Sequence, residues 1–338
     1  MSASPASPDR PPTMRRLAAE CGLSLATVSR ALRGEAEVTA KTRQRVREAA
    51  DRLGYACNPY VGQMMSGLRR GQREAVQGNL GFLWWDDAPG LDSSHAGAMR
   101  RHALARAAEL GYAVSEFSLR QQSPAALVRV MGSRGIRGVL VLSPMTAVGK
   151  SHLSVKLDGF ACVSIGWSLY SPAFHRVRFD HFQATRLAIH HGKKRFGERL
   201  AVVVDTRYDR RSDRSCRAAF LSHHPGGPAA AAKLVFDFPR LDLQKLRRVY
   251  EDGRFAGLIA LNEGQLPRAL FDWFPREHMI YLDDAGASPC FGRVDLRHDL
   301  LGRWAVDQLV GTIQRQETGE PEVPMTIFIP PRWVPGPR

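Results

Sequence analysis

The sequence lacks any long hydrophobic run. No stretch of its 338 residues approaches the roughly 18 consecutive apolar residues from which a transmembrane helix is built. Its first 13 residues, MSASPASPDRPPT, are polar and rich in proline, without the apolar core found in signal peptides. We therefore expect a chain that is neither exported nor in contact with a membrane.

The sequence also has few cysteines, and their spacing excludes two common uses. None of the five stands in a Cys-x-x-Cys pair, which argues against a disulfide framework and a zinc site and favours a reducing compartment. We expect each to be a small apolar residue, buried or half-buried. The five are Cys21, Cys57, Cys162, Cys216 and Cys290.

Motifs of enzyme chemistry are lacking as well. No G-x-S-x-G, H-E-x-x-H, phosphate-binding loop or G-x-G-x-x-G stands in the strand–helix context that its chemistry requires. The adjacent histidines at 190–191 and 223–224 do not share a helix face, so neither pair is expected to chelate a metal alone. We expect no catalytic residue, no metal and no cofactor.

What the sequence has in excess is positive charge, with a formal net charge of +15 and a pI near 10.2. Residues 1–73 hold 13 Lys and Arg against 6 Asp and Glu, whereas the other 265 residues hold 35 against 27. This distribution favours a polyanionic partner at the N-terminal end, although a basic surface can also serve solubility alone.

The N-terminal segment is predicted to form three short helices. Thr13, Ser24 and Thr39 stand where helix N-caps are expected, and Gly22 suits the tight turn between the first two helices. In the second helix, Val28 and Leu32 repeat at helical spacing. Helix, turn, helix and a third bracing helix form the helix-turn-helix arrangement, whose second helix enters the DNA major groove.

From Asn79 onward, apolar strand-like runs alternate with helical patterns in two successive series. This alternation predicts βαβ units and parallel sheets, and two series predict two lobes with a cleft between them. The predicted helices of this part cover 94–110, 123–134, 181–196, 211–223, 241–252, 263–273 and 297–317.

Residues 13–68 resemble the lactose-repressor (LacI/GalR) family of bacterial transcription regulators. MRRLAAECGLSLATVSRALRG resembles the helix-turn-helix of that family, VTAKTRQRVREAADRLGY its third helix, and CNPYVGQMM the start of its hinge. The resemblance implies an all-α helix-turn-helix DNA-binding domain followed by an α/β two-lobed core like that of periplasmic binding proteins. It also implies the following division: a disordered tail at 1–12, the DNA-binding domain at 13–56, a hinge at 57–78, and an effector-binding and dimerisation core at 79–338, with lobe 1 at about 79–178 plus 293–322 and lobe 2 at about 179–292 plus 323–338.

The resemblance assigns DNA contacts to the second helix and to the hinge. Leu25, Ala26 and Arg30 occupy positions that face bases in the family, and an arginine there is suited to a bidentate contact with guanine. Met64 stands where family members insert an apolar wedge into the minor groove, although it could instead pack against a partner hinge. Four further residues are assigned to phosphates: Ser24, Thr27, Ser29 and Asn58.

The core is expected to hold a small-molecule effector between its lobes, at the carboxyl ends of the strands. One of Trp84 and Trp85 is expected in the core and the other at the ligand. The resemblance suggests Asn262 and Asp283 as polar ligand groups, with helix or loop capping as the alternative. Arg214 and Arg217 stand beside Cys216, the position where the family often has an arginine that binds the ligand. Gly166 stands where aspartate is common and is followed by Trp167, which indicates a pocket more aromatic and less acidic than in sugar-responsive relatives.

Together these features predict a homodimeric, effector-responsive DNA-binding transcription regulator, a repressor rather than an activator, that is not an enzyme. Its expected partners are a pseudopalindromic double-stranded DNA operator and a small molecule such as a sugar or related metabolite. Its expected location is the bacterial cytoplasm, at the nucleoid when bound to DNA. The rival interpretations are a pure sugar-binding module and a sugar- or nucleotide-processing enzyme. The basic three-helix head argues against the first, and the lack of a nucleophile or acid–base pair argues against the second.

Overall fold

The computed structural model describes residues 14–33, 38–53, 77–85, 95–142, 151–283 and 289–336. The chain divides into two compact units, Met1–Arg73 and Glu74–Arg338. Within the described residues, no helix is long and apolar enough to span a membrane. Four of the five cysteines lie in this part, and all four are buried, as predicted: Cys21, Cys162, Cys216 and Cys290.

The first unit consists, in its described part, of α1 (Met14–Cys21), α2 (Leu25–Arg33) and α3 (Ala40–Leu53). The three predicted helices are thus confirmed, and Gly22 takes the positive φ of +57° that the turn requires. Arg45 of α3 donates a hydrogen bond to the carbonyl of Cys21, which ties the end of α1 to α3. The small core contains Leu17, Ala18, Cys21, Val28, Ala31, Val38, Val46, Ala49 and Ala50.

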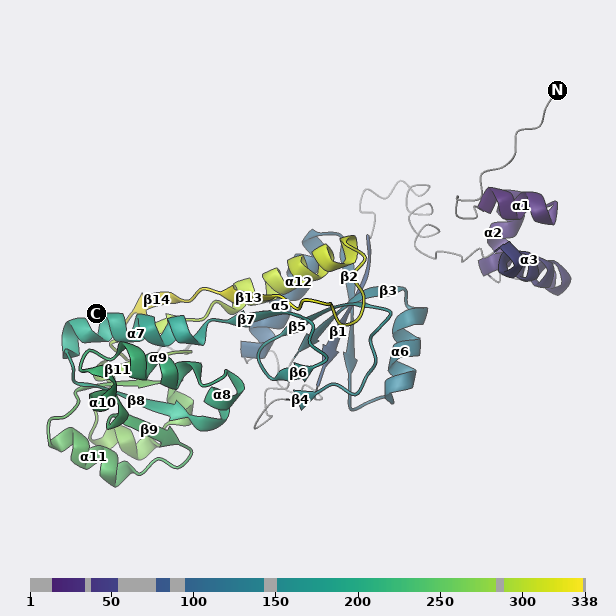
Figure 1. The fold of residues 1–338 in the computed structure, drawn as a ribbon. Coiled ribbons are helices and arrows are strands. Elements are labelled where there is room, and N and C mark those ends of the chain that lie inside the picture. The colour runs from purple at the N-terminus through teal and green to yellow at the C-terminus, as the bar shows by residue number, and fades with distance from the viewer. Residues whose placement is uncertain are drawn as a thin grey trace. The chain divides into compact units, whose positions relative to one another are not determined.

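The second unit contains two six-stranded sheets (Figure 1). The first has the order β13-β7-β5-β3-β1-β2, and all of its neighbours are parallel. Buried side chains alternate between its two faces, so that α5 and α12 pack on one face and α6 on the other. This first lobe comprises β1 (Gly78–Trp84), α5 (His95–Glu109), β2 (Tyr112–Ser118), α6 (Pro124–Ser133), β3 (Ile136–Leu142), β5 (Ala161–Ile165), β7 (His175–Phe179), α12 (His298–Gln314) and β13 (Thr326–Ile329), with a small pair of strands, β4 (Ser151–His152) and β6 (Leu169–Ser171).

The second sheet has the order β14-β12-β11-β10-β8-β9, in which only β14 is antiparallel to its neighbour. Its core includes Phe220, Phe255, Phe274 and Tyr281, each at most 1% exposed. The second lobe comprises α7 (His181–Phe196), β8 (Leu200–Asp205), α8 (Thr206–Arg211), α9 (Ser215–His223), α10 (Gly227–Ala232), β9 (Val235–Phe238), α11 (Leu243–Glu251), β10 (Gly257–Ala260), β11 (Met279–Tyr281), β12 (Gly292–Asp295) and β14 (Arg332–Pro335).

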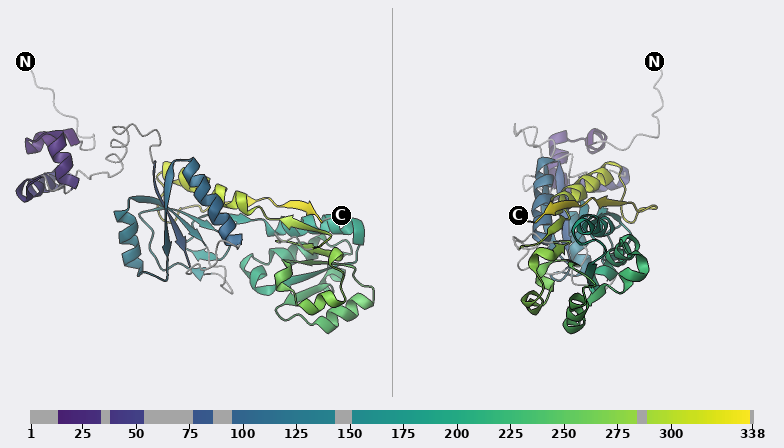
Figure 2. Two further views of the ribbon diagram at one scale, coloured as in Figure 1. Left: turned by 180° about the vertical axis from the view of Figure 1, so that it is seen from behind. Right: turned by 90° about the vertical axis from the view of Figure 1, so that its left-hand side faces the viewer.

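The chain passes between the two sheets three times: from β7 to α7, from β12 to α12, and from β13 to β14. The last passage is visible as the yellow segment in Figures 1 and 2. Two strands therefore differ from the predicted lobe boundaries. β12 pairs with β11 in the second sheet rather than belonging to lobe 1, and β13 pairs with β7 in the first sheet rather than belonging to lobe 2.

Two predicted helices are wrong as continuous elements. The segment 263–273 forms two 3₁₀ turns, Glu263–Gln265 and Arg268–Asp272. Pro267 separates them because it has no N–H to donate and holds Leu266 in an extended conformation. The segment 211–223 breaks between α8 and α9, where Asp213 and Arg214 both have positive φ.

Candidate functional site

Helix α2 is held at its start by a local capping interaction. The backbone N–H of Thr27 donates to Oγ of Ser24 at 3.1 Å, and the two hydroxyl oxygens lie 2.8 Å apart. This bond satisfies one of the N–H groups that a helix leaves without an intrahelical partner at its N-terminus. The start of α2 therefore has a defined position on the turn that follows α1.

The two sides of α2 differ sharply in burial. Val28 and Ala31 are fully buried in the three-helix core, whereas Leu25 is 44% exposed and Ala26 is exposed. Arg30 is half-buried. An exposed leucine beside an exposed alanine adds nothing to the core, so this end of the helix is available to a surface outside the unit.

The other predicted DNA-contacting residues are placed as follows. Ser24 is exposed, and Thr27 and Ser29 are half-buried on α2, so the structure brings six of the eight predicted residues together at one helix and its cap. Asn58 and Met64 lie outside the described residues.

A cavity of about 580 Å³, counting the solvent at its mouth, lies between the lobes of the second unit. Its walls come from both lobes, and the apolar residues come from the first. None of the described residues that line it is Asp or Glu. The first lobe and its loops contribute Met99, Leu142, Ile165, Gly166, Trp167, Ser168, Phe179, His298 and Leu301, and the second lobe contributes His181, Tyr208, Arg211 and Ser212.

The indole of Trp167 forms a fixed part of the wall. Its Nε1–H donates to the carbonyl of Phe179 at 3.2 Å, and the guanidinium of Arg178 lies 3.5 Å from the ring centroid. A ring held by a hydrogen bond and a cation–π contact loses little further freedom when a ligand packs against it. The aromatic pocket predicted from Gly166 and Trp167 agrees with their positions in the lining.

Two polar side chains of the second lobe meet in this cavity as neutral groups. The Tyr208 hydroxyl and Nε2 of His181 lie within hydrogen-bond distance, at 3.1 Å. Burial, reinforced by the nearby charges of Arg178 and Arg211, lowers the pKa of His181 to about 3. Burial also raises the pKa of Tyr208 well above its ordinary value. At neutral pH the pair can exchange hydrogen bonds with a ligand but supplies no charge.

The permanent charge among the described lining residues is that of Arg211. Its guanidinium lies 5.3 Å from the ring centroid of Tyr208, and the residue is half-buried. Burial lowers the pKa of Arg211, but arginine starts from a value so high that the group remains a cation at neutral pH. On the opposite wall, Nε2 of His298 lies 3.8 Å from Oδ1 of Asp283.

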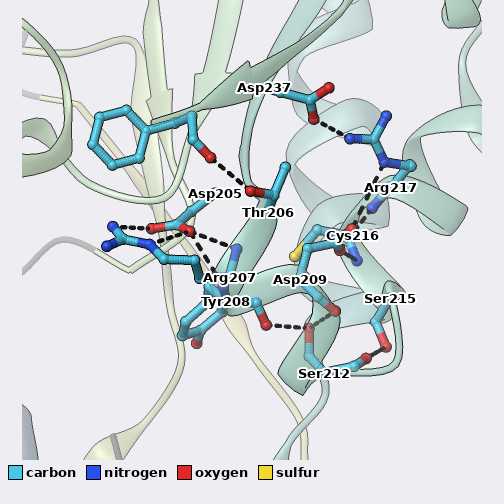
Figure 3. Close-up of polar contacts among 11 residues, drawn as sticks. Asp205, Thr206, Arg207, Tyr208, Asp209, Ser212, Ser215, Cys216, Arg217 and Asp237 are labelled. Atoms are coloured by element: carbon cyan, nitrogen blue, oxygen red, sulfur yellow. Dashed lines mark hydrogen bonds and ion pairs between the residues drawn. The ribbon is translucent and has the colours of Figure 1, made fainter. Parts of the chain in front are cut away.

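The corner between α8 and α9 is held by two buried aspartates (Figure 3). Asp205 caps α8 by accepting the N–H groups of Arg207 at 2.9 Å and of Tyr208 at 3.2 Å. Asp209 accepts the N–H groups of Cys216 at 3.1 Å and of Arg217 at 3.3 Å. These bonds fix the cavity-lining residues of α8 relative to β8 and α9.

The two tryptophans predicted near the ligand differ in burial, as expected. Trp84 is 6% exposed, stacks on Phe82 at 4.5 Å and donates to Glu116 at 2.9 Å. Trp85 is half-buried against the core on the opposite face of the sheet. Neither is among the described residues that line the cavity.

The four predicted polar ligand groups also stand outside the cavity lining. Arg214 is exposed, and Arg217 contacts the carboxylates of Asp209 and Asp237. Asn262 caps a 3₁₀ turn by accepting the N–H of Gln265 at 3.1 Å, which is the alternative role foreseen for it. Asp283 approaches the cavity through its contact with His298. A part in effector binding stays a prediction for all four residues.

Several lining residues were not identified from the sequence. Phe179 comes from β7, His181 from α7, and Tyr208 and Arg211 from α8, and residue spacing alone does not bring these three elements together. The signal that could have found them is position: FDHF begins with the last residue of β7 and enters α7, and DTRYDRR begins with the last residue of β8 and continues as α8. Residues just after parallel strands gather at the edge of the sheet where ligands bind.

Metal binding finds no support in the described part of the chain. No group of three or more His, Cys, Asp or Glu residues lies close enough together there to hold a metal ion. The adjacent histidines at 190 and 191 instead contact each other edge to face, and His191 stacks on Trp333 at 4.3 Å.

Comparison with known proteins agrees with this arrangement. Residues 13–58 match the model of the bacterial regulatory proteins of the lacI family. The HTH-type transcriptional regulator GntR of Pseudomonas aeruginosa is 26% identical over 192 residues, which are 57% of this chain and 53% of that protein. The alignment thus spans about half the length of that relative.

Two solved structures resemble nearly the whole chain. One is the lac repressor dimer bound to operator and the anti-inducer ONPF, with a TM-score of 0.52 and 17% identity over 96% of this chain and 98% of that one. The other is the transcriptional regulator CelR–cellobiose complex, with a TM-score of 0.50 and 17% identity over the same shares. At these identities the likeness establishes the two-lobed fold. The N-terminal helices thus match the lacI family model, and the whole chain has the fold of these two regulators.

Proposed function

We propose that this protein is a homodimeric transcription regulator that represses by binding a pseudopalindromic DNA operator, and that a small molecule in the interlobe cavity controls its operator affinity. The proposed division keeps the DNA-binding domain at 13–56, the hinge at 57–78 and the effector core at 79–338. The protein acts without catalysis, in the bacterial cytoplasm, and at the nucleoid when bound to DNA.

The observation that carries this proposal is the two-sided burial of α2. Val28 and Ala31 pack in the three-helix core, whereas Leu25 and Ala26, at the capped start of the helix, are exposed. A helix-turn-helix protein reads bases with the N-terminal part of this second helix. We assign base contacts to Leu25, Ala26 and Arg30; phosphate contacts to Ser24, Thr27, Ser29 and Asn58; and the minor-groove wedge to Met64.

The core supports control by a ligand. A ligand changes DNA affinity only to the extent that it binds one arrangement of the protein better than another. The interlobe cavity is lined by side chains of both lobes, so a bound molecule has different contacts when the lobes change their separation. The likeness to a repressor dimer whose structure holds both operator and an anti-inducer supports the same division of tasks.

The test measures sequence discrimination. Full-length protein selects an operator from a pool of randomised duplexes, and fluorescence anisotropy then compares that operator with a scrambled duplex at several salt concentrations. We expect a steep salt dependence for both duplexes and tight binding of the operator alone. Equal affinity for the two duplexes would contradict sequence-specific regulation.

The decisive variant is Arg30→Ala. Loss of a bidentate guanine contact costs about 1–3 kcal/mol for the operator and spares the scrambled duplex. Arg47→Ala, which removes an exposed arginine of α3, is the matched control and should leave the ratio of the two affinities unchanged. An unchanged ratio for Arg30→Ala would remove this residue from base recognition.

A further inference from the structure

We propose that the effector is an aromatic carboxylate rather than a neutral sugar: its ring packs on the apolar wall of the first lobe and its carboxylate pairs with Arg211 of the second. This inference rests on the proposed function for its regulatory meaning. The ligand chemistry itself follows from the cavity and can be tested without DNA.

The wall of the first lobe offers a sugar few partners. A buried sugar requires hydrogen bonds for its hydroxyl groups, because each hydroxyl taken from water without a partner is costly. The described residues of this wall are mainly apolar, and the Nε1–H of Trp167 is already donated to the Phe179 carbonyl. An aromatic ring needs no such partners and gains from the burial of its faces and edges. Five lining residues of this wall have wholly apolar side chains: Met99, Leu142, Ile165, Phe179 and Leu301.

The charge of the cavity favours a carboxylate as the polar group of the ligand. No described lining residue carries a carboxylate, and His181 and Tyr208 are neutral. Arg211 thus places a positive charge at the second-lobe end, where the carboxylate of Asp283, 3.8 Å from Nε2 of His298, also acts on Tyr208. Asp205 and Arg207, which have opposite signs, also act on the Arg211 guanidinium. Charge-assisted hydrogen bonds from arginine to a carboxylate are among the stronger polar contacts in proteins.

The ring and the carboxylate of the ligand contact different lobes, and this gives the ligand a regulatory role. Arg211 stands at the end of α8, and Asp205 and Asp209 fix this helix on the second lobe. Trp167 and Phe179 follow or end strands of the first lobe. A molecule with a ring at one end and a carboxylate at the other touches both lobes at once. It therefore favours the arrangement in which both contacts form.

The probes are benzoate, phenylacetate, 3-phenylpropionate and indole-3-acetate, each with its matched amide, and cellobiose as a neutral sugar. Binding to the full-length protein without DNA is measured by thermal shift and by tryptophan fluorescence at millimolar ligand. We expect at least one acid to raise Tm, and its amide to bind about tenfold or more weakly because the amide lacks the charge that pairs with arginine. Three results would overturn the inference: no acid binds, an acid and its amide bind equally, or cellobiose binds more tightly than every acid.

Variants locate the contact. Arg211→Met should weaken the acid about tenfold or more and leave the amide unchanged, whereas Arg210→Met, at an exposed neighbour on the same helix, should change neither. Equal binding of the acid to Arg211→Met and wild type would overturn the assignment. If the Arg211 variant does not fold, Arg211→Lys keeps the charge and should retain part of the preference for acid over amide; loss of that preference would overturn the assignment as well.

The two proposals can fail separately. A protein that binds aromatic acids through Arg211 but never discriminates an operator would refute the proposed function alone. A protein that discriminates its operator but binds none of the acids would refute this inference alone.

Discussion

The two lobes of the core are built alike and contribute differently to the cavity between them. Each has a six-stranded, mainly parallel sheet, and each presents residues that follow or flank its strands. The first lobe contributes most of the apolar lining, and the second contributes a neutral His181–Tyr208 pair and a cation. Similar backbones thus supply burial on one side and directional contacts on the other. The comparison teaches that the fold provides the cleft, whereas a few side chains decide what enters it.

The lobes also differ in what fixes their cavity ends. In the first lobe, α5 and α12 approach so closely that a Cβ added at Gly302 would lie 2.3 Å from the carbonyl oxygen of Met99. In the second lobe, the buried carboxylate of Asp209 holds the start of α9. One end depends on close packing and the other on buried hydrogen bonds. Two substitutions test this contrast, and a third tests an exposed ion pair of the first lobe.

The largest effect is expected for Gly302→Val in the first lobe. The added atoms would meet backbone atoms of α5, which cannot move as a flexible side chain would. The two helices must separate, and we expect a loss of about 3 kcal/mol in the free energy of unfolding. Urea denaturation followed by circular dichroism measures it. Gly132→Ala on α6 is the control, because no atom beyond its chain neighbours and its own helix backbone lies within 4 Å of an added Cβ there. A Gly302→Val protein as stable as the control would contradict the close approach.

A smaller effect is expected for Asp209→Ala in the second lobe, where the N–H groups of Cys216 and Arg217 would lose their acceptor. An orphaned buried donor costs about 1–3 kcal/mol, and we expect about 2 kcal/mol in all because Cys216 is buried whereas Arg217 is half-buried. Burial raises the pKa of Asp209, which means that its ionised form carries a desolvation cost that Asn avoids. Asp209→Asn keeps an acceptor oxygen and should stay within about 1 kcal/mol of wild type. Equal losses for Ala and Asn in the same urea assay would show that the charge, rather than the two hydrogen bonds, holds α9.

The smallest effect concerns the exposed edge between α5 and α12. Hydrogen bonds from Arg303 and Arg106 lower the pKa of Glu109 from 4.5 to about 2. Because its folded-state pKa is depressed, this group stabilises the fold above about pH 4.5 and loses that contribution as the pH falls toward 2. Glu109→Gln should therefore show a slightly flatter dependence of Tm on pH between about 5 and 3. Glu322→Gln, at an exposed loop position, is the comparison. Identical pH profiles for wild type and Glu109→Gln would show that the Glu109 interactions do not contribute to stability.

Regular elements could be predicted from the sequence where local signals agree. The caps at Ser24 and Thr39, the turn at Gly22 and the apolar spacing of Val28 all indicate the observed helices. The break after α8 could not be predicted in this way, because the residues with positive φ are Asp213 and Arg214 rather than glycine. Pro267, in contrast, did signal the end of a helix, and its effect on Leu266 outweighed the helical pattern around it.

The cavity was harder to predict than the strands around it. Gly166 and Trp167 follow a clear apolar strand, and the resemblance, which places aspartate at the first of these positions, indicated an aromatic pocket. His181 and Tyr208 meet only after α7 and β8 have packed together, which single-sequence spacing does not encode. The sequence did not indicate which of Trp84 and Trp85 lies in the core. The contacts of Trp84 with Phe82 and Glu116 place it there.

The three passages of the chain between the sheets have a consequence for folding during translation. Most of the second lobe is translated before the first lobe is complete. The first lobe still lacks α12 and β13, which are translated after most of the second lobe. The second sheet in turn waits for β14 at residues 332–335 to add its edge strand. Neither lobe can finish folding before its last strand, β13 for the first and β14 for the second, has left the exit tunnel. An ancestral swap of one lobe would have required several separate cuts in the coding sequence.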